Sequence, residues 1–210
     1  QMTFEQGYQC FCKENDISVS DEGLPEKLYE LRAACRNVSN YFRRKTVFTI
    51  LKAGYPVEVF GKAWNRFAQE CTDHAFDSEE SIQKICKKNL RIHPAISAGE
   101  IPAIMAQSKI SLNVMTWHKA GMTERIATSM LAGAVCLSDE TSYLREHFED
   151  GQEIVLFSLE HLEKLPEKLE WLLKENTWAE IAENGRKKAL AEHTWDRRAR
   201  ELLQMIEKTS

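Results

Sequence analysis

The stretch KISLNVMTWHKAGMTERIATSMLAGAVCLSD, residues 109–139, combines two kinds of pattern and decides the fold. It begins with the apolar run 109–115 and ends with the run 134–139, and neither run alternates clearly between polar and apolar residues. Strands of this kind are expected where both faces of a parallel sheet are covered. Between them lies a helical segment that begins near Thr123 and ends at Gly133. A strand, a helix and a second strand in this order predict a βαβ unit.

The same alternation extends over the central part of the chain. Short apolar or β-branched runs, each followed by a helical pattern, lie at residues 57–61, 90–94 and 153–158. Before and after this part, apolar residues at three- and four-residue steps predict helices alone. We expect an α/β fold, a Rossmann-like open parallel sheet with helices on both faces and helical segments at both ends. The expected domains are a helical amino-terminal segment, 1–54, and a Rossmann-like domain, 55–210.

Charge and composition narrow the class of protein. The 210 residues carry a formal net charge of -4 at pH 7, which argues against a nucleic-acid or anionic-membrane surface, since either needs a basic excess. Local basic runs such as Arg43-Arg44-Lys45 are interpreted as solvated helix faces. No apolar run approaches the roughly 20 residues of a membrane span, and no signal pattern begins the chain, so we expect a cytoplasmic protein. A start at Gln1 instead of methionine is expected for a piece of a longer protein.

Several chemistries lack their sequence signature. No G-x-G-x-x-G follows a strand, and no P-loop, G-x-S-x-G elbow or H-E-x-x-H motif occurs. The six cysteines lack the spacing of a zinc site, and no Asp-x-Asp pair is present to hold the metal of a sugar nucleotide. We expect a metal-independent site without a cofactor.

Ligands of open parallel sheets bind beyond the carboxyl ends of the strands, where each loop enters the next helix. The loops in this position contain Gly61 and Lys62 after the first strand and His93 after the second. Residues 116–123 follow the third strand, and Asp139 ends the fourth. These loops are the candidate binding surface.

The third loop leads to an arginine at an unusual place. Gly121 permits a close approach of the backbone to a ligand, Thr123 is the expected N-cap, and the first-turn amides attract anions. The helix dipole disfavours a cation there by up to about 1 kcal/mol. Arg125, with Lys119 before it, becomes favourable if the site holds a diphosphate or another multiply charged group that the guanidinium can bind with two hydrogen bonds. The alternative is that Arg125 pairs with Glu124 or extends into water.

The stretch from residue 108 to 157 resembles the nucleotide-sugar-binding half of GT-B glycosyltransferases, specifically the bacterial group-one and spore-maturation-protein-like enzymes. The resemblance depends on the small-residue helix that ends at Gly133, the next strand, an acidic loop and FEDGQEIVLF at 148–157. It extends from about VEVFGKAW to HTWDRRARELL, residues 57–203. It implies a carboxy-terminal domain that binds a nucleoside-diphosphate sugar, and a missing amino-terminal domain that carries most of the acceptor site.

The resemblance also implies roles for individual residues. In these enzymes a glycine-rich loop, a basic residue and a helix amino terminus hold the diphosphate, and backbone after a middle strand meets the base. Gly61 and Lys62 then fall in the first loop, His93 near the base, and residues 121–125 at the diphosphate. The full set of candidate substrate-binding residues is Gly61, Lys62, His93, His118, Lys119, Gly121, Met122, Thr123, Glu124, Arg125, Thr128 and Asp139.

The chain departs from the family pattern at one pair of positions. Many retaining members carry two glutamates separated by seven residues, where this chain has Ala120 and Thr128. Glu124 lies one helical turn from Thr128 and is the expected substitute for the ribose contact. The leading hypothesis is sugar transfer from a nucleoside-diphosphate sugar, with no catalytic residue assigned and the fragment alone inactive. The alternatives are a non-catalytic nucleotide-sugar-binding module and a sugar-nucleotide epimerase-like enzyme.

Overall fold

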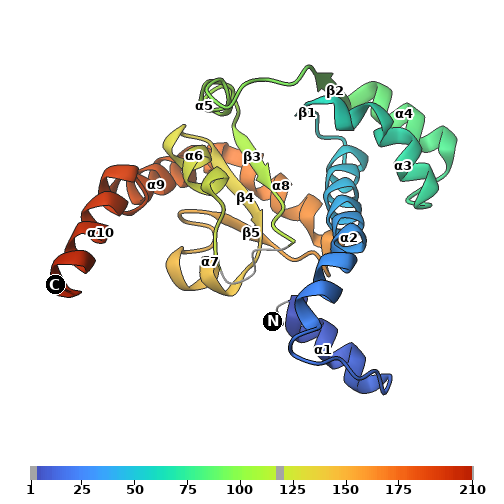
Figure 1. The fold of residues 1–210 in the computed structure, drawn as a ribbon. Helices are drawn as coiled ribbons and strands as arrows, with labels where there is room; N and C mark the ends of the chain where they lie inside the picture. The colour runs from blue at the N-terminus through green and yellow to red at the C-terminus, as the bar shows by residue number, and fades with distance from the viewer. Residues whose placement is uncertain (1–3, 117–120, 210) are drawn as a thin grey trace.

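The computed structural model describes residues 4–116 and 121–209, and its helices surround short parallel strands (Figure 1). The strands are β1 (Val57–Phe60), β2 (Leu90–His93), β3 (Ile110–Asn113), β4 (Val135–Asp139) and β5 (Val155–Phe157). The α-helices are α1 (Phe4–Glu14), α2 (Leu24–Lys52), α3 (Phe67–Asp73), α4 (Glu79–Asn89), α5 (Ile101–Met105), α6 (Glu124–Leu131), α7 (Ser142–His147), α8 (Leu165–Leu173), α9 (Thr177–Glu192) and α10 (Trp195–Thr209). The 3-10 helices are η1 (Lys62–Arg66), η2 (Leu162–Lys164) and η3 (Lys174–Asn176).

The strands lie within the runs expected from the sequence and form parallel ladders. β1 pairs with β2, and β4 lies between β3 and β5. The α/β fold with open parallel strands and surrounding helices is confirmed. The strands of the described residues divide between a two-stranded and a three-stranded ladder, and no pairing joins β1 to β3. Apolar patterning predicts which segments are strands, but it does not specify which neighbouring edges pair.

Strand β4 is the centre of the larger ladder and is buried along its whole length. Because successive side chains of a strand point to opposite faces, Val135 and Leu137 pack toward α8 and α9, whereas Cys136 packs toward α6 and α7. On that second face, Ile126 and Met130 of α6 are fully buried. The expectation of a strand covered on both faces is confirmed.

The carboxy-terminal half of α2 belongs to the cores of both ladders. Val47, Phe48 and Leu51 pack with buried residues of α3 and α4, while Ile50 packs with the residues between the larger ladder and α8. Gly54, with φ of +92°, follows the helix and allows the chain to turn toward β1. This long helix fixes one side of the space between the ladders.

The last two helices differ in how they pack. Gly185 of α9 lies so close to the backbone of Glu153 that a Cβ atom would clash with its carbonyl oxygen. α10 instead extends away from the ladders (Figure 1), and Trp195 is 85% exposed. No helix within residues 4–116 and 121–209 is both long enough and apolar enough to cross a membrane.

Candidate functional site

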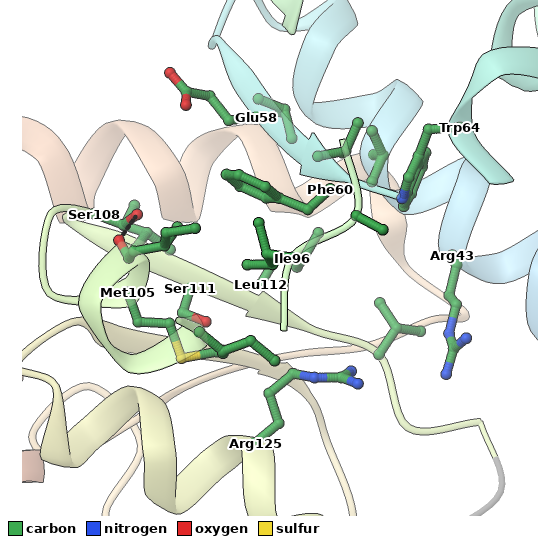
Figure 2. A pocket seen from close by; sticks show the side chains of 18 residues that line it. Arg43, Glu58, Phe60, Trp64, Ile96, Met105, Ser108, Ser111, Leu112 and Arg125 are labelled. Atoms are coloured by element: carbon green, nitrogen blue, oxygen red, sulfur yellow. Dashed lines mark hydrogen bonds between the residues drawn. The ribbon is translucent and has the colours of Figure 1, made fainter. Parts of the chain in front are cut away.

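A cavity of about 490 Å³ opens between β1 and β3, the facing edges of the two ladders (Figure 2). Its volume lies within the range of small-molecule sites, roughly 300–1,000 Å³. Phe60 projects into it from β1, and Leu112 lies across from β3. Trp64 and Ile96 complete the wall near the carboxyl ends of the strands. The cavity is therefore largely apolar, extends between the two strands along their length, and reaches their carboxyl ends, where a parallel sheet is expected to bind its ligand.

Two arginines stand at one end of this cavity. Figure 2 shows the guanidinium groups of Arg43, from α2, and Arg125, from α6, directed toward each other. Burial lowers the pKa of Arg43, and the positive charge of Arg125 lowers it further, whereas the carboxylate of Asp139 opposes the shift. Neither arginine forms an ion pair with any residue that the structure describes. Two converging cations with one nearby carboxylate leave an excess of positive charge at the mouth of the cavity.

Arg125 is held by a short series of hydrogen bonds. Its Nη1 donates to Oδ1 of Asn113 at 3.3 Å, and Nδ2 of Asn113 donates to Oγ of Ser138 at 3.0 Å. Asn113 and Ser138 are partners across the β3–β4 ladder, and both are buried. Arg125 thus bonds to Asn113, with no ion pair to Glu124 among the described residues, while the residue as a whole is exposed, as the alternative of a solvated arginine expected.

Arg43 is fixed by its place on α2. One turn earlier, the hydroxyl of Ser39 is hydrogen-bonded to the hydroxyl of Thr116, at the start of the loop after β3. One turn later, Val47 is buried in the core. Arg43 therefore lies on the face of α2 that meets the ladders, although its own side chain is exposed at the cavity mouth.

Asp139 has a structural partner at the end of β4. Its carboxylate is completely buried and accepts the backbone N–H of Met115, just beyond β3. It thereby ties the ends of two neighbouring strands and places a negative charge behind Arg43. Contact between Asp139 and a substrate stays a prediction.

The start of α6 agrees in part with the sequence. Thr123 is the N-cap, with extended backbone (φ -89°, ψ 155°), but its side chain makes no capping hydrogen bond. Its Oγ1 is buried without a partner among the described residues, a state that costs about 1–3 kcal/mol if no ligand satisfies it. Met122 packs against the core beneath α6, and there is open space around Gly121 where a Cβ would lie.

Glu124 and Thr128 lie one turn apart on α6, as expected. The hydroxyl of Thr128 donates to the backbone carbonyl of Glu124 at 3.0 Å. Glu124 is exposed, and its ribose contact stays a prediction.

The loops after β1 and β2 are joined to each other. Gly61, with φ of +111°, donates its N–H to the carbonyl of His93 at 3.0 Å. The His93 ring stacks on Phe60 with 4.7 Å between ring centroids, and Nε2 lies 3.1 Å from the Glu58 carboxylate. Lys62 is exposed and begins η1 outside the cavity wall. His93 thus stacks on Phe60 of the cavity wall, while Lys62 lies on the protein surface.

Two expected residues, His118 and Lys119, lie outside the described residues, as does Ala120. Sequence reasoning missed Arg43, because it interpreted the run 43–45 as a solvated helix face. That interpretation is wrong for Arg44, which is 7% exposed and forms an ion pair with Glu70. One feature of the sequence could have indicated Arg43: it lies four residues from Ser39 and from Val47, which are buried on α2, and therefore on the same face of the helix.

Sequence comparison identifies a family for most of the chain. Residues 43–204 match the model of a family described as glycosyl transferase-like. No curated protein shows significant sequence similarity to this chain.

Solved structures show the same fold at low sequence identity. HepE from Anabaena, solved with UDP and glucose, has a TM-score of 0.60 and 14% identity over 76% of this chain and 43% of its own. TarM has a TM-score of 0.57 and 13% identity over 80% of this chain and 32% of its own. A glycosyltransferase from Rickettsia africae has a TM-score of 0.57 and 12% identity over 99% of this chain and 52% of its own. The chain thus spans about half or less of these proteins, and the expected fold, Rossmann-like as in one half of a GT-B fold, is confirmed.

Proposed function

This chain belongs to the glycosyl transferase-like family, and we propose that it is the donor-binding domain of an enzyme that transfers a sugar from a nucleoside-diphosphate sugar. The observation that carries this proposal is the convergence of Arg43 and Arg125 at the mouth of the cavity. A diphosphate supplies the multiple negative charges that such a pair would bind, and guanidinium groups match phosphate oxygens in geometry. The likeness to HepE, which was solved with UDP-glucose, supports the same ligand class.

The apolar wall complements this anion site. A nucleoside joins an aromatic base to the diphosphate, so a donor anchored at the arginines would direct its uncharged part along Phe60, Trp64 and Ile96. Lys62, His118 and Lys119 remain predicted contacts to the same donor.

The arginines would also act on the reaction itself. When the bond between sugar and diphosphate breaks, negative charge develops on the leaving diphosphate. Cations and helix amides that are already in place stabilise this charge without having to reorganise. Arg43, Arg125 and the first turn of α6 fill this role in the proposal. The acceptor site would belong to a domain outside this chain, in agreement with the chain's share of its structural relatives.

A thermal-shift panel tests donor binding. The chain is heated with nucleoside monophosphates, nucleoside diphosphates and UDP-glucose, and a ligand at 100 times its dissociation constant should add about 2.7 kcal/mol of stability. We expect stabilisation by a diphosphate, which is lost in Arg125→Ala and kept in Arg36→Ala, an exposed arginine of α2. The proposal fails if no diphosphate shifts the transition, or if Arg125→Ala responds as the parent does.

A second candidate is a nucleotide-sugar-binding module that transfers nothing. It is favoured by Thr128, whose hydroxyl bonds to the Glu124 carbonyl at a position where many retaining enzymes carry a glutamate. Incubation with radiolabelled UDP-glucose separates the two candidates. Binding without transfer to an acceptor or to water, when the chain is combined with the rest of its protein, would favour the module.

A further inference from the structure

We propose that Asn113 is a positioning residue, which aims the Arg125 guanidinium into the cavity and leaves its positive charge available to a bound anion. The nature of that anion, a nucleoside diphosphate, rests on the proposed function. The inference comes from the hydrogen bonds that join Arg125, Asn113 and Ser138.

In this series each group donates a hydrogen bond to the next, from Arg125 to Asn113 and from Asn113 to Ser138. A guanidinium can only donate, so the atom that faces Arg125 must be an acceptor, which is Oδ1 of Asn113. The amide nitrogen of Asn113 then donates to Oγ of Ser138, whose own hydrogen goes to the Asp139 carbonyl at 3.2 Å. Rotating the amide by 180° would place its NH₂ group against the guanidinium, which cannot accept a hydrogen bond, and Ser138 could then bond to Oδ1 only by giving up its bond to the Asp139 carbonyl. The network therefore selects one orientation of Asn113 and, through it, of Arg125.

These polar side chains lie where apolar residues would otherwise be expected. Asn113 is 3% exposed, and the adjacent cross-strand pair in the same ladder is Leu112 with Leu137. Burying an amide or a hydroxyl is unfavourable unless it is hydrogen-bonded. The bond to Arg125 satisfies the remaining amide acceptor and links this buried pair to the cavity.

The Asn113 side chain is uncharged, and this affects anion binding by Arg125 as much as its shape does. A carboxylate at this position would accept the same bond from Arg125, but it would neutralise the guanidinium and compete with the phosphate. An amide holds the side chain without this competition. Asn113→Asp changes the charge while nearly preserving the shape, so it separates the two effects.

The experiment is calorimetric titration of the chain with UDP. We expect Asn113→Asp to weaken binding at least about tenfold, because the introduced carboxylate occupies Arg125. Ser138→Ala should weaken binding about threefold, because the amide loses the partner that fixes its orientation. Asn89→Asp is the matched control. Asn89 is also a buried asparagine but donates to the Leu51 carbonyl far along α2, so its replacement should lower stability and leave affinity unchanged.

A second measurement does not depend on the ligand. Adding Arg125→Gln to Asn113→Asp should lower the melting temperature sharply, because it leaves a buried carboxylate unpaired, whereas Arg125→Gln alone should change it little. Equal effects in the two backgrounds would overturn the contact between residues 113 and 125.

The titration distinguishes failure of this inference from failure of the proposed function. If the parent binds UDP, Arg125→Ala does not, and Asn113→Asp retains the parent affinity, the positioning role is overturned and the proposed function stands. If the parent binds no nucleoside diphosphate, both fail.

Discussion

Arg43 and Arg44 are neighbours in α2, yet they lie in opposite electrostatic environments. Arg44 is buried, forms an ion pair with Glu70 and donates to the Ala63 carbonyl at 3.1 Å. Its guanidinium also lies 5.4 Å from the centre of the Trp64 ring. Arg43 faces another arginine at the cavity mouth and has no ion pair with any residue in the described part of the chain.

The difference assigns different roles to two adjacent residues of one helix, stabilising the fold for Arg44 and binding a ligand for Arg43. Arg44 has partners from η1 and α3, so its charge is compensated within the protein. Arg43 and Arg125 repel each other until an anion lies between them. We therefore expect substitutions of Arg44 to lower stability and substitutions of Arg43 to lower affinity.

The largest effect is expected for Arg44→Gln. This change leaves Glu70 without its cation in a partly buried setting, and it should cost about 2–4 kcal/mol of unfolding free energy. Urea denaturation measures the loss. Adding Glu70→Gln should recover part of it, because the unpaired carboxylate is removed. A loss smaller than about 0.5 kcal/mol, the range of an ordinary surface change, would show that Arg44 is not a structural residue.

Arg43→Gln should show the converse behaviour. Losing one guanidinium from the anion site should weaken binding of UDP about tenfold, or 1.4 kcal/mol. Stability without ligand should stay within about 0.5 kcal/mol of the parent, since a repulsive contact is removed. Calorimetric titration and urea denaturation measure the two quantities, with Arg36→Gln as the control. An unchanged affinity, or a loss of stability equal to that of Arg44→Gln, would contradict the assignment.

Ionic strength should have a smaller effect, and it should change the affinity for a diphosphate at Arg43 more than the stability contributed by Arg44. Between 50 and 200 mM KCl, roughly spanning Debye lengths of 14 to 7 Å, binding of a diphosphate to exposed arginines should weaken measurably. The dependence should be shallower in Arg43→Gln. The stability difference between the parent and Arg44→Gln should barely change, because the buried ion pair is little screened. Parallel salt dependences for parent and Arg43→Gln would show that Arg43 does not contact the ligand.

The contrast also shows what the sequence can predict. Apolar periodicity predicted the helices and the parallel strands, and the loop after β3 led to Arg125 because loop position follows from strand order. Nothing in the run Arg43-Arg44-Lys45 distinguishes its members, because their environments depend on Glu70 and Trp64, far along the chain, and on Arg125. The proposed role of Asn113 could not be predicted from the sequence either. The function of a polar residue at the end of a buried strand can be inferred only when its cross-strand partner, here Ser138, is known.

The shared ligand of Arg43 and Arg125 can be tested most directly by a double-mutant cycle on the affinity for UDP. Titrations would compare the parent, Arg43→Gln, Arg125→Gln and the double variant. If both guanidinium groups hold one diphosphate, each single change weakens binding, and the double change departs from additivity by at least about 0.5 kcal/mol. Additive losses, or a single variant that binds UDP as tightly as the parent, would contradict a common site.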